Sequence, residues 1–380
     1  MLSATLANKD NSTTATASIA GLRDLAVQGL VQMLDPQSQL FCYKLRKSAC
    51  GLEREGISHR YTMMTLLGLH RLEATGQPTH MDIQAILEAL LRDTSWVTCA
   101  GDLGLLLWTC ALVAPGRLTE VCGRLKVKGA LNRYSDGRDV YTMELAWLLA
   151  GIAHCVLAGG DNESELVEQG MAVFHLLKLN CGATGICGHL AKGRTIRGFL
   201  RGRIGSFADQ VYPIYAFSMF ARACNNDEAK RMALQTARTI CQLQGPQGEW
   251  SWHYDSSTGR IVSRYPVYSV HQHAMAPLAL FAVGDATGEN FSDYIYKGLS
   301  WISGNNELGM DFVEHSHGVI WRSIYLGRSD AYIDSALRAL MVRNGSAPSG
   351  QLRIKYECRP YELGWLLYAF AGRGREGIRR

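Results

Sequence analysis

The sequence predicts an all-α protein with the architecture of an α/α toroid, in which about six inner helices are surrounded by about six outer helices. Two observations predict it. Almost wholly apolar helical segments alternate with amphipathic, charged ones along 380 residues, and helices that are apolar on every side belong in the interior. Apolar residues make up 47% of the chain and charged residues 19%, which is enough to build a large core. We expect residues 18–380 to form a single domain.

The apolar segments are the predicted inner helices. They begin near Tyr61, Asp102, Tyr141, Phe207, Ser269 and Pro360. The amphipathic segments between them are the predicted outer helices, at Met81–Asp93, Arg117–Lys126, Glu163–Leu179, Asp227–Leu243, Phe291–Ile302 and Ser329–Val342. In a ring of this kind all inner helices run in one direction, so their N-termini meet at one end. We also expect short β-hairpins in the loops at that end.

Polar residues gather at the predicted starts of the inner helices. They are Arg60, Tyr61, Asp102, Tyr141, Glu144, Asp209, Gln210, His271, His273, Tyr361 and Glu362. Free backbone N–H groups and positive helix dipole ends converge at the same place. Each residue alone is compatible with helix capping or with a satisfied hydrogen bond in the core. As a set they indicate a lined pocket, because a polar group entering a core is costly unless it has a partner or a use.

Neither the charge pattern nor a targeting signal indicates a macromolecular partner. The net charge of +5 is spread along the chain without a run of like charges, so we expect no nucleic acid as partner. Residues 1–17 show no signal-peptide pattern, and we expect a flexible segment there. The longest apolar run, Leu145 to Ala158, contains His154 and is interpreted as a buried helix, which leaves no membrane span. The eleven cysteines form no C-x-x-C pair, which predicts reduced core thiols and a cytoplasmic protein.

The first of three long loops, Cys181 to Gly205, is rich in arginine. It contains Arg194, Arg197, Arg201 and Arg203 with almost no acidic residue. Guanidinium groups suit a phosphate, a diphosphate or a uronate carboxylate, although a solvated basic loop has the same composition. Cys181, Cys187 and His189 lack an evident fourth ligand, so we expect no zinc site, no other metal and no cofactor.

The second loop, Gln244 to Pro277, carries the densest chemistry. Trp250, Trp252 and Tyr254 alternate before a turn and a second short strand, which predicts a β-hairpin over the mouth of the ring. Alternate residues of a strand share a face, so the three rings form either a platform for a sugar, a shield for a carbocation, or a plug. Asp255, Arg264, Tyr265, Tyr268, His271 and His273 follow closely, and such a mixture suits general acid–base catalysis.

His271 and His273 are two residues apart. On a helix this spacing sends their side chains toward nearly opposite faces, so they are not joint metal ligands. We predict that His271 points into the pocket. A buried structural histidine is the alternative.

The third loop, Gly304 to Ser323, predicts another hairpin that turns near His317 and Gly318. Glu314 or Asp311 could supply a second carboxylate for a hydrolase. Arg322 closes the loop.

Gln244, Gly248 and Trp250 form Q-x-x-x-G-x-W, which resembles the QW repeat of terpenoid cyclases, where glutamine and tryptophan tie the end of an outer helix to the next turn. Weaker echoes lie at Leu177 to His189 and Val31 to Tyr43. The chain thus resembles the broad α/α toroid group, which includes terpenoid cyclases, prenyltransferases and six-hairpin glycosidase-like enzymes. It departs from the cyclases, since it has neither a D-x-D-D nor a D-D-x-x-D motif, and the zinc triad of protein prenyltransferases is not recognisable.

The leading hypothesis is a carbohydrate-active enzyme, a hydrolase, lyase or epimerase that acts on an anionic oligo- or polysaccharide. The predicted proton-transfer residues are His271, Tyr268, Asp209 and Asp255. The predicted substrate-binding residues are Trp250, Trp252, Tyr254, Arg197, Arg201, Arg264, His273, Arg322, Tyr141, Glu144 and Tyr361. An isoprenoid cyclase or transferase, in which aromatic rings stabilise cations, and a non-catalytic toroid that binds a partner or glycan stay open as alternatives.

Overall fold

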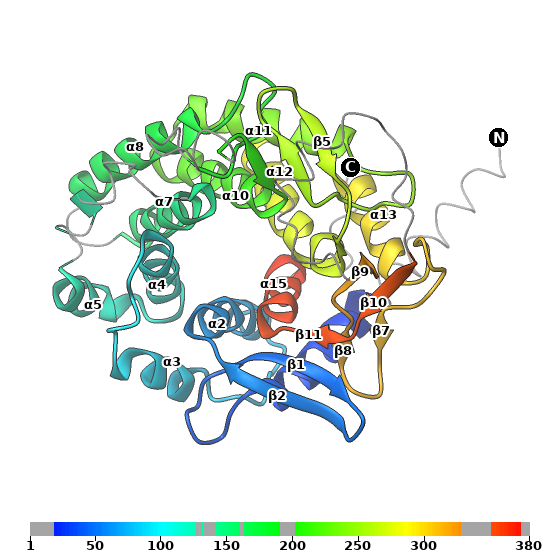
Figure 1. Ribbon diagram of the computed structural model, residues 1–380. Coiled ribbons are helices and arrows are strands. Elements are labelled where there is room, and N and C mark those ends of the chain that lie inside the picture. Colours follow the sequence, from blue (N-terminus) through cyan, green and yellow to red (C-terminus); the bar gives the residue numbers. More distant parts are fainter. Residues whose placement is uncertain are drawn as a thin grey trace, which may run out of the picture.

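The computed structural model describes residues 19–126, 129, 131–132, 141–159, 163–190, 202–327 and 351–373. The inner helices are α2 (His59–Glu73), α4 (Ala100–Val113), α7 (Thr142–Leu157), α10 (Ala208–Cys224), α12 (Ala276–Thr287) and α15 (Pro360–Phe370). Each packs against the next, and α15 returns to α2, so the ring closes (Figure 1). The outer helices are α3 (Ile83–Arg92), α5 (Leu118–Leu125), α8 (Glu163–Leu179), α11 (Asp227–Gln242) and α13 (Ser292–Ile302). The predicted toroid is confirmed.

The burial patterns explain which helices are inside. In α4 every residue except Leu112 is buried. In α3 the buried residues follow steps of three and four and leave the other face in solvent; they are Ile83, Ile86, Leu87, Leu90 and Leu91. One-sided burial of this kind stabilises a helix on the outside of a ring.

Glycines let neighbouring inner helices approach closely. A Cβ atom on Gly68 of α2 would lie 2.1 Å from the carbonyl oxygen of Gly364 of α15. A Cβ atom on Gly104 of α4 would lie 2.3 Å from the backbone nitrogen of Leu148 of α7. These positions exclude any larger side chain unless the helices move apart.

Aromatic side chains fill the axis of the ring. The ring of Trp108 stacks on those of His154, Tyr215 and Trp365, at centroid distances of 5.1, 4.7 and 5.3 Å. The indole N–H of Trp365 donates to the hydroxyl of Tyr212 at 3.0 Å. The interior below the polar end is therefore packed with side chains.

The sixth outer position is occupied by an N-terminal helix that the sequence analysis missed. Residues 19–33 are helical and lie against α15, where Arg23 donates to the carbonyl oxygen of Phe370 at 3.4 Å. Apolar residues at Leu22, Leu25 and Ala26 are buried there. The predicted helix at Ser329–Val342 and the segment 1–17 lie outside the described residues.

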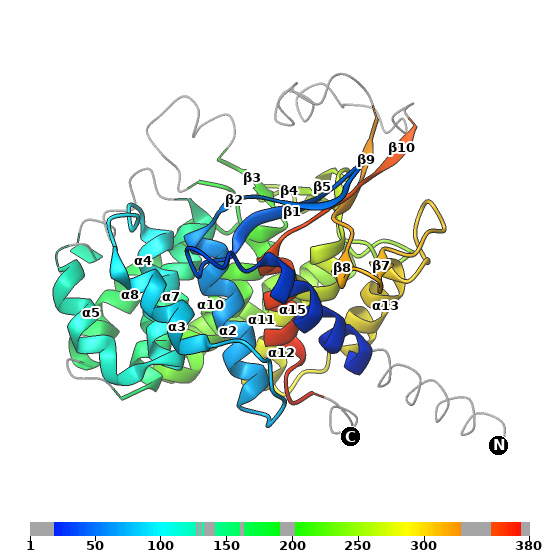
Figure 2. The ribbon, with the colours of Figure 1, turned by 90° about the horizontal axis from the view of Figure 1, so that it is seen from below.

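Short antiparallel sheets cover one end of the ring (Figure 2). They have the strand orders β11–β1–β2, β10–β9–β6 and β3–β4–β5. The strands are β1 (Cys42–Ser48), β2 (Gly51–Ile57), β3 (Ile204–Ser206), β4 (His253–Asp255), β5 (Arg260–Ser263), β6 (Val267–Tyr268), β9 (Ser323–Leu326), β10 (Leu352–Lys355) and β11 (Glu357–Cys358). The β4–β5 hairpin was predicted, whereas the β1–β2 hairpin was not.

The third-loop hairpin forms as predicted, with β7 (Val313–Glu314) paired to β8 (Val319–Ile320). It packs against the helix of residues 19–33, since the amide of Gln32 donates to the carbonyl oxygen of His317 at 2.8 Å. Asp311 and Glu314 bind backbone or side-chain groups of their own loop. This hairpin therefore lies beside the ring, near α13 (Figure 2).

The QW-like motif makes the ties expected of it. The Gln244 side-chain amide, just after α11, donates to the carbonyl oxygens of Gly248 at 3.0 Å and of Tyr294 in α13 at 2.9 Å. Trp250 is fully buried and packs on Gly298 of α13. The motif thus joins two outer helices.

One cysteine prediction is wrong. Cys181 and Cys187 form a disulfide, because an isolated antiparallel bridge places the two residues opposite each other. The other nine cysteines are free thiols, including the buried Cys110 and Cys155.

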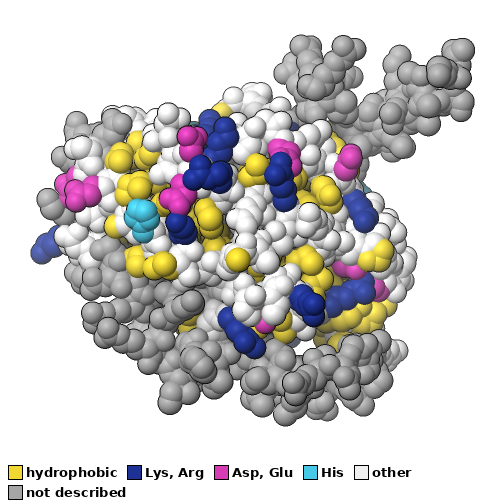
Figure 3. All heavy atoms as spheres, turned by 90° about the horizontal axis from the view of Figure 1, so that it is seen from above, with side chains coloured by type: hydrophobic (Ala, Val, Ile, Leu, Met, Phe, Trp, Pro, Cys, Tyr) yellow, Lys and Arg dark blue, Asp and Glu magenta, His cyan; other side chains and the backbone are white. Residues whose placement is uncertain are grey.

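The outer face over α8 and α11 carries charged side chains of both signs, with hydrophobic side chains in small separate groups (Figure 3). Within the described ranges, no helix combines the length and the apolar character needed to cross a membrane.

Candidate functional site

The N-terminal rim of the ring is the end where all inner helices begin and where most of the strands lie (Figure 2). Its polar side chains form two clusters. Arg60 and Tyr61, adjacent at the start of α2, belong to different clusters, so the two lie side by side on the rim.

The acidic cluster contains Arg60, Asp102 and Glu144. Nε of Arg60 is 2.5 Å from Oδ1 of Asp102, and Nη2 of Arg60 is 3.9 Å from Oε1 of Glu144. Burial raises the pKa of Glu144; Arg60 opposes this rise, and the neighbouring Asp102 adds to it. Glu144 is thereby suited to hold a proton and release it, while Asp102 is engaged by the guanidinium.

A histidine–aspartate pair stands next to Glu144. Nδ1 of His189 is 3.0 Å from Oδ2 of Asp209, and the same oxygen accepts from the backbone N–H and the hydroxyl of Ser206 at 2.8 and 2.9 Å. The Asp209 side chain is 1% exposed and that of His189 is 23% exposed. Asp209 therefore orients the imidazole from behind, and His189 is the member that can meet a substrate. The ring of Tyr141 lies 4.9 Å from that of His189.

Sequence reasoning placed Tyr141, Glu144 and Asp209 in the pocket, and the structure brings them together. His189, which the sequence suggested only as a candidate zinc ligand, lies beside Tyr141 and Asp209. No local sequence signal relates His189 to Asp209, because the two residues are twenty positions apart in the chain.

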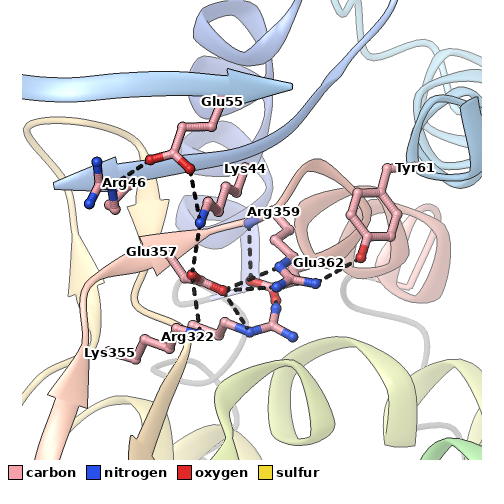
Figure 4. A network of polar contacts seen from close by, with 9 residues as sticks. All are labelled: Lys44, Arg46, Glu55, Tyr61, Arg322, Lys355, Glu357, Arg359 and Glu362. Carbon is pink, nitrogen blue, oxygen red and sulfur yellow. Dashed lines mark hydrogen bonds and ion pairs between the residues drawn. The ribbon is translucent and has the colours of Figure 1, made fainter. Parts of the chain in front are cut away.

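The basic cluster centres on Glu357 of β11 (Figure 4). Its carboxylate lies 3.0 Å from Nε of Arg322 and 3.1 Å from Nη2 of Arg359. Arg322 also pairs with Glu362 of α15. Lys44, Arg46, Lys355 and Glu55 complete the network, which holds more cations than carboxylates.

Tyrosines line the basic cluster on the side of the ring. Nη1 of Arg359 donates to the hydroxyl of Tyr61 at 2.9 Å, and the rings of Tyr61 and Tyr361 are 4.6 Å apart. The guanidinium of Arg322 lies 4.8 Å from the ring centre of Tyr268. Arg322, Tyr268 and Tyr361 are thus neighbours at the rim.

The aromatic platform predicted for the hairpin is not present as such. Trp250 and Tyr254 are 0% exposed, and both pack against Phe207 at the start of α10. Only Trp252 is half-buried; its ring lies 4.7 Å from that of Tyr268. Strand alternation does not reveal which face turns inward, and here two of the three rings serve the core.

His271 and His273 lie in a π-helical turn, η2 (His271–Met275), that leads into α12. Both are buried, and burial lowers the pKa of each to about 3. The His271 ring lies 4.4 Å from Phe207 and 6.0 Å from Trp252, which it stacks against. His271 is therefore buried and stacked on Trp252, which agrees with the alternative of a buried structural histidine and not with the prediction that it points into the pocket. His273 is a core residue.

The remaining predicted residues are occupied elsewhere. Asp255 accepts from the backbone and hydroxyl of Ser257 in its own turn, so it shapes the hairpin and does not face the acidic cluster. Arg264 is held by Glu249 at 2.5 Å and by Glu307 at 3.0 Å. Arg197 and Arg201 lie outside the described residues. In the part of the chain that the structure describes, no three His, Cys, Asp or Glu side chains gather as metal ligands.

The sequence matches no protein-family model and no curated protein. Solved structures nevertheless resemble the chain over nearly its whole length. One, from Klebsiella pneumoniae, is described as a possible member of the GH105 family; it has a TM-score of 0.59 at 12% identity, over 95% of this chain and 93% of that one. The unsaturated glucuronyl hydrolase of Bacillus sp. GL1, described as responsible for the degradation of glycosaminoglycan, has a TM-score of 0.60 at 14% identity, over 94% and 96%.

A third structure, an unsaturated glucuronyl hydrolase specific for heparin, gives a TM-score of 0.58 at 14% identity, over 95% of this chain and 99% of that one. At such low identity the likeness concerns the fold. The chain has the α/α toroid fold of six-hairpin glycosidase-like structures.

Proposed function

We propose that the protein is a carbohydrate-active enzyme that acts on an anionic oligo- or polysaccharide by general acid–base chemistry. The observation that carries the proposal is the acidic cluster, in which Glu144 has a raised pKa beside the Arg60-bound Asp102. A carboxyl group with a raised pKa beside a guanidinium-bound carboxylate is suited to act as a proton donor.

Glu144 is the proposed proton donor. His189, oriented by the buried Asp209, is the proposed second proton-transfer group, because its ring is partly exposed and its Nδ1 is fixed at 3.0 Å. Trp252 and Tyr268 offer ring surface to a sugar. Of the residues predicted from sequence, Tyr141, Glu144, Asp209, Tyr268, Arg322, Tyr361 and Trp252 belong to this proposed site.

The charge of the rim supports an anionic substrate. The basic cluster has more cations than carboxylates and lies beside the acidic cluster, so its excess positive charge would attract a sugar carboxylate to this rim. Neighbouring folds named as unsaturated glucuronyl hydrolases and as a polysaccharide lyase agree with this choice.

An isoprenoid cyclase is less well supported. Such chemistry needs an apolar cavity below the mouth, whereas Trp108, Trp365 and Tyr212 fill the axis of this ring. A glycan needs only the polar rim. The remaining alternative, a toroid that binds a glycan without catalysis, is separated from an enzyme by whether a product forms in the experiment below.

The test is incubation of the whole chain with uronate-containing oligosaccharides, followed by mass spectrometry of the products. Addition of water identifies a hydrolase, an unsaturated product of unchanged total mass identifies a lyase, and unchanged mass with altered stereochemistry identifies an epimerase. Glu144→Gln should lower the rate by roughly 10²–10⁴-fold, whereas Glu120→Gln on the outer helix α5 should not.

Full activity of Glu144→Gln would refute the assigned proton donor. Turnover of prenyl diphosphates alone would refute the substrate class. Binding of uronates without any product would favour the non-catalytic alternative.

A further inference from the structure

A cavity of about 270 Å³ lies at the opposite end of the ring, where the inner helices end. Side chains from all of the inner helices line it, among them His70, Leu112, His154, Met219, Phe281 and Tyr368. The aromatic column around Trp108 separates this cavity from the N-terminal rim. It is therefore not part of the proposed active site.

Arginines dominate the charge of this cavity. Arg71, Arg222 and Arg373 line it, and Asp285, the one carboxylate among its described lining residues, pairs with Arg373. Among the described residues, no carboxylate forms an ion pair with Arg71 or Arg222. Within the described ranges, two guanidinium groups of the cavity thus have no counter-charge.

Aromatic rings hold two of these guanidinium groups in place. Arg71 lies 4.5 Å from the ring centre of Tyr368, and Arg373 lies 4.3 Å from that of Phe281. A guanidinium stacked on a ring keeps the N–H groups of its edge available, in the planar fork that suits a carboxylate or phosphate.

A neutral hydrogen-bonded chain forms the inner wall. Nε2 of His154 is 2.9 Å from the hydroxyl of Tyr215, which is 2.8 Å from that of Tyr368. Burial, together with the positive charges of Arg71 and Arg222, lowers the pKa of His154 to about 3. The imidazole is therefore uncharged, and the cation excess of the cavity comes from the arginines.

Helix dipoles account for only part of this arrangement. The C-termini of parallel helices favour cations, which explains basic residues in these last turns. Carbonyls at the helix ends, however, are engaged by backbone N–H groups: those of Glu73, Val156 and Phe370 accept from Gly76, Gly159 and Arg373. The arginine donors are consequently not used up by the helix ends.

We propose that this cavity binds a small organic anion, a carboxylate or a phosphate ester attached to a single compact ring. The volume suits one ring and is too small for a chain of sugars. Apolar side chains such as Leu112, Met219 and Leu278 would contact the ring body, and Arg71 and Arg222 would bind the anionic group. Because such a ligand touches the ends of all inner helices, its binding stabilises the ring as a whole.

The test uses benzoate, phenyl phosphate and the neutral benzamide as probes, with calorimetric titration of the whole chain and the NMR signals of His154 as readouts. Benzoate or phenyl phosphate should bind and shift the His154 signals, and the tighter of the two identifies the anionic group. The double variant Arg71→Met, Arg222→Met should weaken binding by at least about tenfold. Arg92→Met, in the last turn of the outer helix α3 and outside both rim clusters, is the matched control.

The variant Asp285→Asn tests whether a change in binding could come from misfolding. It removes the carboxylate that pairs with Arg373 and should tighten binding, which a damaged fold cannot do. Equal binding of benzamide and benzoate, no binding of either anion, or unchanged affinity in the double arginine variant would each overturn the proposal.

Discussion

Oε1 of Glu144 lies 3.9 Å from Nη2 of Arg60, and the same guanidinium is bound to Asp102 through Nε. The proton affinity of Glu144 is therefore set by a cation that it shares. Burial raises the pKa of Glu144 and Arg60 restrains the rise.

Replacing Arg60 by methionine should raise the pKa of Glu144 further, because the restraining charge is lost. A carbon-13 titration of the glutamate side chains measures the change, with Glu144→Gln to assign the signal and Arg46→Met as control. Because the pKa of Glu144 is raised in the folded protein, the stability linked to its protonation is fully present below the pKa of an unfolded glutamate. This stability is lost as the pH rises through the pKa of Glu144 in the folded protein. A lowered or unchanged pKa in Arg60→Met would contradict the geometry.

Glu357→Ala should destabilise the protein by about 3–5 kcal/mol, because it leaves Arg322 and Arg359 partly buried without their shared carboxylate. Glu357 is 3% exposed. Glu55→Ala is the matched control from the same network: its side chain is 35% exposed, so the expected cost is about 0–1 kcal/mol. Urea unfolding of both variants gives the comparison, and equal losses would show that burial does not matter here.

The inner helices could be predicted because their apolar residues continue around every face, and the periodicity of an outer helix such as α3 is equally plain. The starts of those helices then located Glu144 and Asp209 at one rim. Whether the aromatic side chains of the β4–β5 hairpin point into the core or toward solvent could not be predicted. Alternation places Trp250 and Tyr254 on one face, but only packing against Phe207 decides that this face is the buried one.

Contacts between segments far apart in the chain could also not be predicted from the sequence. The pairing of β1 with β11 joins Leu45 to Cys358, and nothing local in either segment signals it. The β1–β2 hairpin has charged residues on both faces, so its alternation is weak. The helix of residues 19–33 has apolar residues at helical spacing, among them Leu22, Leu25 and Leu30, so its local sequence does contain a helix signal.

The Cys181–Cys187 disulfide predicts a thiol count. Alkylation of the protein unfolded without reductant should modify nine cysteines, and reduction should raise the number to eleven. Intact-mass spectrometry separates the two cases. The double variant Cys181→Ser, Cys187→Ser should give nine under both conditions, whereas eleven modified cysteines in the unreduced wild type would show that the bond does not form.

Gly104→Ala should destabilise the ring by about 1–3 kcal/mol or more, since the added Cβ would lie 2.3 Å from the backbone nitrogen of Leu148 and α4 and α7 must separate. Gly123→Ala in α5 is the control, because no atom lies within 4 Å of its added Cβ. That control should be neutral or stabilising by up to about 1 kcal/mol, as alanine favours a helix. Thermal unfolding of both variants checks the difference; a harmless Gly104→Ala would mean that the helices are not in close contact.

Acidification should weaken the fold through its buried histidines. His154, His271 and His273 each have a pKa lowered to about 3 by burial, so between that value and about 6.5 the unfolded chain binds protons that the folded chain does not. Their contribution is fully present above the unfolded pKa and is lost as the pH falls, by about 2 kcal/mol for each histidine between pH 7 and pH 5.

Glu144 and Glu362, whose pKa values are raised, act in the opposite direction, so the informative quantity is a difference between variants. Urea unfolding at the two pH values should show that His271→Gln reduces the loss by about 2 kcal/mol, whereas His317→Gln, on the exposed hairpin, leaves it unchanged. If His271→Gln and the wild type lose the same free energy of unfolding between the two pH values, His271 is protonated in the folded protein. That result would contradict its buried position against Trp252.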